Sequence, residues 1–207
     1  MSLRQSQSPY GYQKLLVYRK AEELQQECVR FTATFPREKT LIALADQMDR
    51  SARSVKQNIV EGWKRNSTRE YYDFLGFSLG ANAELEEDCN DLINEVYEEK
   101  GLKGIMGEKG QTLTEVERLR FYPLDTHLPL LIQLKLRGKE LNLLLEKLQA
   151  SLAEKMVDEG RLAPADQLAG RRKRRGAEDQ WFAKQLEEQN LVRLPNGQIV
   201  TRDGKTE

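Results

Sequence analysis

Apolar side chains recur along the first part of the chain at alternating spacings of three and four residues. This spacing is typical of a helix that buries one face. The first such stripe predicts a helix from about Tyr12 to Phe35, ended by Pro36, which has no backbone N–H. Its members are Val17, Ala21, Leu24, Cys28, Phe31 and Phe35. The second stripe predicts a helix from about Lys39 to Arg65 and comprises Leu41, Leu44, Ala45, Met48, Ala52, Val55, Ile59 and Trp63.

The third predicted helix begins at Ser67. Ser67 and Glu70 have the spacing of a capping box, in which each side chain hydrogen-bonds the backbone N–H of the other residue. The stripe that follows predicts a helix that ends near Lys100. Its members are Tyr71, Phe74, Leu75, Ser78, Ala81, Leu85, Cys89, Leu92 and Val96.

The fourth predicted helix runs from about His127 to Met156. Asp125 or Thr126 caps it, and Pro129 lies in its first turn, where a missing N–H is tolerated. Its stripe consists of Leu134, Leu141, Leu145, Leu148 and Leu152.

Long helices of similar length, joined by short turns at 36–38 and 66, predict an all-α fold: an up-down antiparallel four-helix bundle. We assign the bundle to residues 8–158, with an insertion at about 101–126, where "LTEVERLRF" predicts a short helix. Residues 159–207 lose the stripe and form a basic C-terminal extension. In it, "QWFAKQLEEQN" predicts a short helix and "LVRLPNGQIVTRDG" predicts a β-hairpin that turns at Pro195-Asn196-Gly197.

Charge and composition narrow the class of protein. Lys+Arg and Asp+Glu number 33 each among 207 residues, so no global field draws the chain to nucleic acid, and only local patches could do so. No apolar run approaches the roughly 18 residues of a membrane span, and the N-terminus has no apolar leader, so we expect a cytoplasmic protein without membrane contact. Cys28 and Cys89 lie in helix stripes, which favours buried free thiols over a disulfide or a metal pair.

Two cationic clusters are candidate binding sites. The first holds Arg50, Arg53, Lys56, Lys64, Arg65 and Arg69, with Glu61 as the only acid between them. It predicts either contact with phosphates or an acidic partner, or a solvated face paired with acids such as Glu84, Glu86 and Glu87. The second is the run Arg171, Arg172, Lys173, Arg174 and Arg175. This run is either a flexible electrostatic handle for nucleic acid or acidic protein, or a plain linker.

The remaining candidates point away from catalysis. Catalysis by Glu61 would need a second titratable group nearby, and the sequence pattern places none there. We therefore interpret Glu61 as the ion-pair partner of Arg65 at i+4. His127 is the only histidine, and no zinc spacing, phosphate-binding glycine loop or nucleophile elbow occurs. We therefore expect no enzyme activity, no metal and no cofactor.

Glycine and aromatic residues at the joint admit two interpretations each. Gly62 either lets helices approach closely or loosens the last turn. Trp63 and the pair Tyr71-Tyr72 are core or subunit contacts rather than platforms for bases, and Trp181-Phe182 anchors the tail on the bundle or on a partner.

Several stretches resemble a known family: "YQKLLVYRKAEEL", the turn at Phe35-Pro36 and Glu38, "QMDRSARSVKQNIVEG" and "FLGFSLGANAELEE". They are similar to the four-helix-bundle proteins first noticed as products of intervening sequences in large-subunit ribosomal RNA genes. "LPLLIQLKLRGKELNLLLEKL" is similar to the variant of that family with a C-terminal suffix.

The resemblance implies an up-down bundle that assembles into a ring-like homopentamer. It also brings in a relative, the accessory variability protein of diversity-generating retroelements, which binds a reverse transcriptase and its RNA through a basic surface. The neutral charge of this chain departs from that relative. The hypothesis is a non-enzymatic oligomeric binding module that contacts RNA or a nucleoprotein. The alternative is a purely structural or protein-interaction oligomer without nucleic acid.

Overall fold

The computed structural model describes residues 9–65, 67–100, 112–161, 176, 179–188, 190–194 and 199–202. The chain separates into two compact units. One comprises Tyr12–Met156 and holds the helical bundle; the other comprises Met1–Gly11 and Val157–Glu207 and holds a short hairpin.

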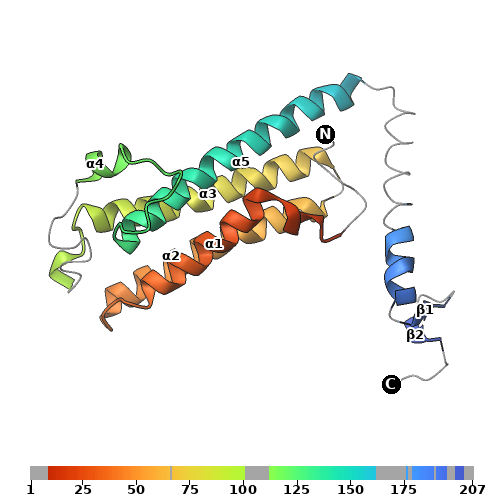
Figure 1. Cartoon of the computed structure of the whole chain (residues 1–207), viewed down its shortest axis with the longest axis horizontal. Helices are drawn as coiled ribbons and strands as arrows, with labels where there is room; N and C mark the ends of the chain where they lie inside the picture. The colour runs from red at the N-terminus through yellow and green to blue at the C-terminus, as the bar shows by residue number, and fades with distance from the viewer. Residues whose placement is uncertain are drawn as a thin grey trace. The chain divides into compact units, whose positions relative to one another are not determined.

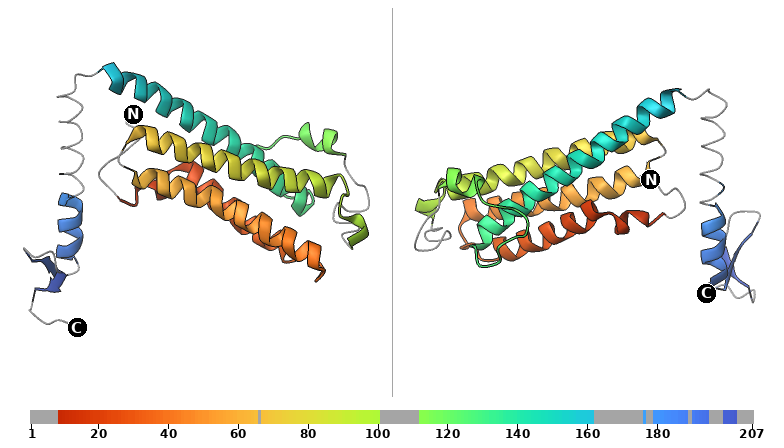
Figure 2. Two further views of the ribbon diagram at one scale, coloured as in Figure 1. Left: turned by 180° about the vertical axis from the view of Figure 1, so that it is seen from behind. Right: turned by 45° about the horizontal axis from the view of Figure 1, so that its top comes forward.

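Four long helices form the first unit: α1 (Leu16–Thr32), α2 (Lys39–Lys64), α3 (Thr68–Ile93) and α5 (Leu130–Arg161). They lie side by side and alternate in direction, as Figure 1 and the two views of Figure 2 show. The prediction of an all-α, up-down four-helix bundle is confirmed. Short 3-10 turns at Gly11–Lys14 and Glu98–Lys100 and the short helix α4 (Leu113–Glu117) complete the order of helical elements in this unit.

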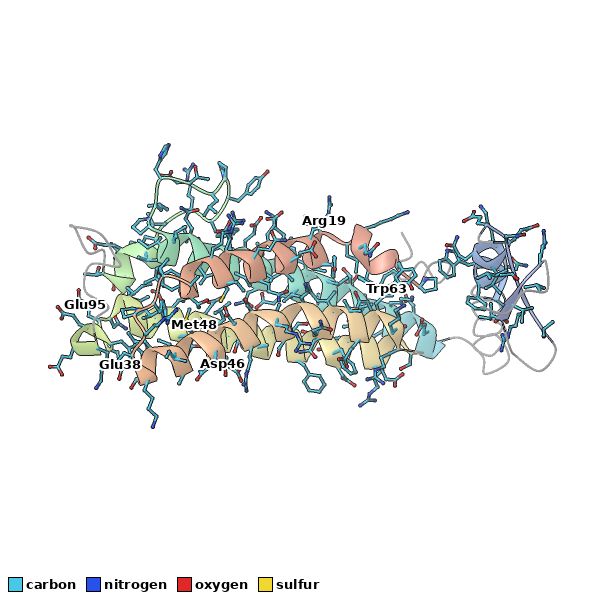
Figure 3. All side chains as sticks on the ribbon, turned by 90° about the horizontal axis from the view of Figure 1, so that it is seen from below. Arg19, Glu38, Asp46, Met48, Trp63 and Glu95 are labelled. Atoms are coloured by element: carbon cyan, nitrogen blue, oxygen red, sulfur yellow. The ribbon has the colours of Figure 1, made fainter. Side chains whose placement is uncertain are left out.

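The core is built from the predicted stripes, whose members are mostly buried between the helices. Tyr71, Met48 and Leu75 are fully buried, as are Cys28 and Cys89, which are free thiols, as predicted. Ala45, Phe35 and Phe74 are only half-buried. Figure 3 shows the difference between the two sides of α2, with Met48 between the helices and Asp46 on the outside.

The predicted ends of the first and third helices were wrong by several residues. α1 begins at Leu16 rather than Tyr12 because Gly11–Lys14 forms a 3-10 turn, and it ends at Thr32, before Phe35. α3 ends at Ile93 because Glu95 adopts a left-handed conformation with φ of 59°, and the Val96 N–H then bonds back to the Asp91 carbonyl oxygen at 3.0 Å. Val96 is consequently exposed rather than part of the core.

A capping side chain decides where α2 begins, and Pro129 precedes the start of α5. Glu38 accepts hydrogen bonds from the backbone N–H groups of Thr40 (2.8 Å) and Leu41 (3.1 Å), and so caps α2. α5 begins at Leu130, directly after Pro129, and extends beyond the predicted end at Met156 to Arg161. The predicted start near His127 and the predicted cap at Asp125 or Thr126 were therefore wrong by about three residues: Asp125 accepts from the His127 N–H at 2.9 Å in the turn before α5.

The insertion contains the predicted short helix. In α4 the Thr112 hydroxyl accepts from the Glu115 N–H, and the Glu115 carboxylate accepts from the Thr112 N–H at 2.8 Å. Val116 is fully buried, and Lys139 of α5 donates to the Glu117 carbonyl oxygen at 2.7 Å. These contacts hold α4 against the bundle.

The second unit contains the predicted hairpin. Residues 179–188 are helical, and strands β1 (Leu191–Arg193) and β2 (Ile199–Thr201) pair in antiparallel fashion with Val192 opposite Val200. The predicted turn at Pro195-Asn196-Gly197 lies outside the described residues. The Trp181 ring lies 5.8 Å from the ring of Tyr10, which belongs to the same unit. No helix in the described part of the chain is both long and apolar enough to cross a bilayer.

Candidate nucleic-acid or partner interface at one end of the bundle

The joint between α2 and α3 is ordered by caps. The Ser67 hydroxyl accepts from the Glu70 N–H at 3.1 Å, and the Glu70 carboxylate accepts from the Ser67 N–H at 3.2 Å. The predicted capping box is confirmed. Ser67 and Glu70 therefore serve to cap the start of α3. Residue 66 lies outside the described part of the chain. Figure 3 places Trp63 at this end of the bundle, and Glu38 and Glu95 at the other.

Gly62 lets α2 and α3 approach closely at the joint. A Cβ atom at this position would lie 2.6 Å from Cδ2 of Tyr71 and 2.9 Å from Cβ of Phe74. Of the two interpretations of this glycine, close helix approach is the one that the geometry supports. Trp63 and Tyr71 are buried with their rings edge to face at 6.2 Å, so both are core side chains, as interpreted.

Arg65 is held in place by two contacts. Its guanidinium lies 3.7 Å from the Glu61 carboxylate, which is the predicted ion pair, and 4.4 Å from the centre of the Phe74 ring. A cation over an aromatic face gains about 0.5–1 kcal/mol at an exposed site. Phe74 in turn meets Phe77 edge to face at 5.5 Å. Arg65 is thus presented in a defined position rather than on a freely rotating side chain.

Lys64 and Arg69 flank Arg65 at the same joint, and both are exposed. The Lys64 ammonium lies 6.0 Å from the centre of the Tyr12 ring. The acids Glu61 and Asp73 lie in the same part of the chain and offset the positive field there. The joint is therefore a small cationic cluster rather than an extended basic surface.

The other predicted members of the first cluster are separated from the joint. Lys56 is mostly buried and lies 4.0 Å from Glu22 of α1, so it joins two helices within the chain. Arg50 and Arg53 lie on the outward face of α2, and Arg50 pairs with Asp46 at 2.8 Å. The six cations that are close in the sequence therefore lie in three places. Lys56 pairs with α1, Arg50 and Arg53 lie on the outward face of α2, and the other three lie at the joint.

The acids named as partners for these cations are engaged elsewhere. Glu84 accepts from the Ser51 hydroxyl at 3.2 Å, Glu86 lies 3.5 Å from Lys135, and Glu87 accepts from Asn90 at 3.0 Å. The pairing predicted with them was wrong because these acids face other side chains. The second cluster, Arg171 to Arg175, lies outside the described residues.

A buried polar network between α3 and α5 was missed from the sequence. The Asn82 side-chain amide donates to the Gly138 carbonyl oxygen at 2.9 Å and to Oδ1 of Asn142 at 2.8 Å. Asn142 donates to Glu86 at 2.6 Å, and Lys135 lies on the other oxygen of that carboxylate. Burial raises the pKa of Glu86, and the ammonium of Lys135 opposes that rise. The available signal was a lysine and a glycine inside the leucine-rich stretch "LLIQLKLRGKELNLLL".

A second buried acid joins α3 to α2. Asp88 accepts from the Gln47 side chain at 3.0 Å, while its Oδ2 is buried without a hydrogen-bond partner among the described residues. Burial, followed by the nearby Asp91 carboxylate, raises the pKa of Asp88 from 3.8 to about 6. Burial also raises the pKa of the Cys28 and Cys89 thiols well above their usual range, so neither is an activated nucleophile.

No group of three or more His, Cys, Asp or Glu side chains is arranged to hold a metal ion within the described ranges. The polar groups described above connect helices, cap them, or carry charge on the surface. They define a helical bundle whose exposed side chains include cations, acids and a few aromatic rings.

The chain thus belongs to the class of all-α, up-down bundle proteins. Residues 13–99 match the family model described as 23S rRNA-intervening sequence protein. This match includes α1, α2 and α3, and over these residues the resemblance found in the sequence is confirmed. Searches of curated proteins and of solved structures each returned no match.

Proposed function

We propose that this protein is a non-enzymatic, self-associating binding module that contacts RNA or a nucleoprotein through the joint cations and the basic run 171–175. The observation that carries the proposal is the arrangement at the joint. Lys64, Arg65 and Arg69 are exposed together at one end of the bundle, and Arg65 is positioned by Glu61 and Phe74. Pre-positioned cations bind phosphate with less loss of side-chain entropy than mobile ones.

The match of residues 13–99 to the intervening-sequence family supports the other parts of the proposal. By resemblance, the assembly is a homopentameric ring, and the nucleoprotein partner is a reverse transcriptase with its RNA. Free, buried cysteines accord with a cytoplasmic setting. A module of this kind needs no catalytic group, cofactor or membrane.

The test is the salt dependence of binding to a fluorescently labelled single-stranded RNA. Each phosphate contact contributes roughly 0.7 to the slope of log affinity against log salt for single strands. The variant Arg65→Glu with Arg69→Glu should therefore lower the slope by roughly 1.4 or more, and should weaken binding at low salt. Serine in place of all five cations at 171–175 tests the tail separately.

The matched control is Arg118→Glu with Arg120→Glu. These two arginines are also exposed, and they follow α4, which lies at the end of the bundle away from the joint (Figure 1). The control should bind RNA as the wild type does. Equal loss of binding in both double variants would show only a dependence on total charge and would contradict a site at the joint.

A second function is favoured by a specific observation: Phe77 of α3 is 59% exposed, and Ile42 of α2 is 56% exposed. Large apolar side chains on an outward face are typical of protein contacts. The alternative is therefore a structural, protein-interaction oligomer without nucleic acid. Absence of RNA binding at low salt, with intact self-association, would select it.

A further inference from the structure

The outward face of α2 carries an excess of positive charge. Arg50 and Arg53 are exposed and adjacent on it, three residues apart. Arg53 makes no ion pair with any residue in the described ranges, while Arg50 reaches only Asp46 on its own helix. The charged side chains that share this face by helical spacing are Lys39, Asp46, Arg50, Arg53, Glu61 and Lys64.

The outward face of α3 carries the opposite charge. Glu84 and Glu87 are exposed in its C-terminal half and form no ion pair within the described part of the chain. Phe77 and Gly80 lie on the same face, and Gly80 has open space around it. The acids that share this face by helical spacing are Asp73, Glu84, Glu87 and Asp91.

Two contacts between α2 and α3 fix the relative level of these faces along the bundle. The Ser51 hydroxyl donates to Glu84 at 3.2 Å, and the Gln47 amide donates to Asp88 at 3.0 Å. Since α2 and α3 are antiparallel, Arg50 and Glu84 lie at nearly the same level, within about one or two residue rises of 1.5 Å. The centres of the cationic and acidic faces are therefore level with each other.

We propose that a second copy of this chain docks here, with the outward face of α2 in one copy against the outward face of α3 in the next. This inference rests on the self-association in the proposed function and names its surface. Rotation about an axis parallel to the helices keeps every residue at its own level, so Arg50 of one copy meets Glu84 and Glu87 of the next, and Arg53 meets Glu84, without a shift along the bundle. Cyclic symmetry of this kind closes an assembly.

The same geometry argues against RNA on this surface. A polyanion that approaches Arg50 and Arg53 also approaches the unpaired acids of the adjacent α3 face, which repel it. A second copy instead pairs both faces at once. Phe77 supplies the apolar anchor that a charged rim needs, since the buried centre of an interface carries most of its binding energy. RNA binding then belongs to the joint, and self-association to the middle of α2 and α3.

Charge reversal and mixing test the proposal. One variant carries Arg50→Glu with Arg53→Glu, and the other carries Glu84→Lys with Glu87→Lys. Like charges across an interface cost several kcal/mol, so each variant alone should self-associate at least about tenfold more weakly than the wild type. An equimolar mixture of the two should recover an assembly that contains both. The measurements are sedimentation and light scattering of the full chain, with thermal unfolding to verify the fold.

The matched controls reverse two exposed charges away from both faces: Glu146→Lys with Glu154→Lys on α5, and Arg118→Glu with Arg120→Glu after α4. Both should assemble like the wild type. Wild-type mass in both α2 and α3 variants would overturn this surface and leave self-association standing. A wild-type chain that stays at its single-chain mass of 23.9 kDa at all concentrations would overturn self-association itself.

A cysteine cross-link gives an independent readout. The two native thiols are buried, so an introduced surface cysteine is the reactive one. A protein with Arg50→Cys mixed with a protein with Glu84→Cys should form a disulfide-linked pair of unlike chains under mild oxidation. The pair Arg118→Cys with Glu84→Cys should not. Equal cross-linking in both mixtures would contradict the proposed docking.

Discussion

Asn82 of α3 donates a 2.9 Å hydrogen bond to the backbone carbonyl oxygen of Gly138 in α5. Gly138 has no side chain to hold the helices apart, and a Cβ atom there would lie 3.1 Å from Cγ of Glu86. The small residue on one helix and the amide on the other together determine how α5 lies on α3. A hydrogen-bond network with several partners forms only in one or a few alignments of the two helices, whereas apolar leucine contacts can form in several alignments.

Asn82→Ala tests the network. The substitution removes a fully buried amide whose nitrogen lies within hydrogen-bonding distance of three acceptors, so we expect a loss of about 1–3 kcal/mol in the free energy of unfolding. Urea unfolding followed by far-UV circular dichroism measures it. Asn58→Ala on α2 is the control, since Asn58 is half-buried and its side chain makes no hydrogen bond within the described part. Equal losses in both variants would contradict a special role for Asn82.

Gly62→Ala tests close approach at the joint. Alanine gains about 1 kcal/mol of helix propensity over glycine, but its Cβ would meet the Tyr71 ring and Cβ of Phe74 at distances that require the helices to separate. Overpacking of this kind costs about 1–3 kcal/mol, so we expect a net loss of stability. Gly80→Ala is the matched control, because Gly80 lies on α3 with open space, and there we expect a gain of about 0.5–1 kcal/mol. A gain at Gly62 would show that the joint is looser than described.

Asp88→Asn tests the buried acid. The pKa of Asp88 in the folded protein, about 6, is above its ordinary 3.8, so the folded state binds a proton more readily than the unfolded state. The contribution of Asp88 to stability is therefore largest below about pH 4 and is lost as pH rises through 6. Asparagine keeps an acceptor for Gln47 and has no charge to desolvate, so the variant should be more stable than the wild type at pH 7.

The measurement is urea unfolding of both proteins at several pH values from 4 to 7. The difference in unfolding free energy between variant and wild type should grow with pH across this window. Glu86, whose pKa burial also raises, is present in both proteins, so its own pH dependence cancels in the difference. A difference that does not change with pH would mean that Asp88 titrates below the window.

Much of the fold follows from local pattern. The spacing of Leu41, Met48, Val55 and their neighbours predicts α2 because those positions share one face whatever lies opposite, and Ser67 with Glu70 predicts the start of α3 from backbone capping alone. Boundaries were less predictable. α3 ends where Glu95 enters a left-handed conformation, and no stripe carries that information.

At the candidate site, too, the sequence predicted part of the arrangement and the tertiary structure decided the rest. Sequence proximity gathered Arg50, Lys56 and Arg65 into one cluster, but helix geometry turns them toward different surroundings. Lys56 faces α1, Arg50 faces outward in the middle of α2, and Arg65 lies at the joint over Phe74. Of the acids predicted to pair with them, Glu86 pairs with Lys135, and Glu84 accepts a hydrogen bond from Ser51 but forms no ion pair within the described residues.

The sequence by itself determined the four amphipathic helices, the capping box at Ser67, the hairpin and the family resemblance, because these depend on residues within a few positions of one another. Only the tertiary structure decided which charged side chains form ion pairs within the described part of the chain and which do not. Whether Asn82 meets Gly138, or Arg50 lies level with Glu84, depends on how α2, α3 and α5 are aligned, and that alignment arises from contacts between residues 33 to 60 positions apart in the chain.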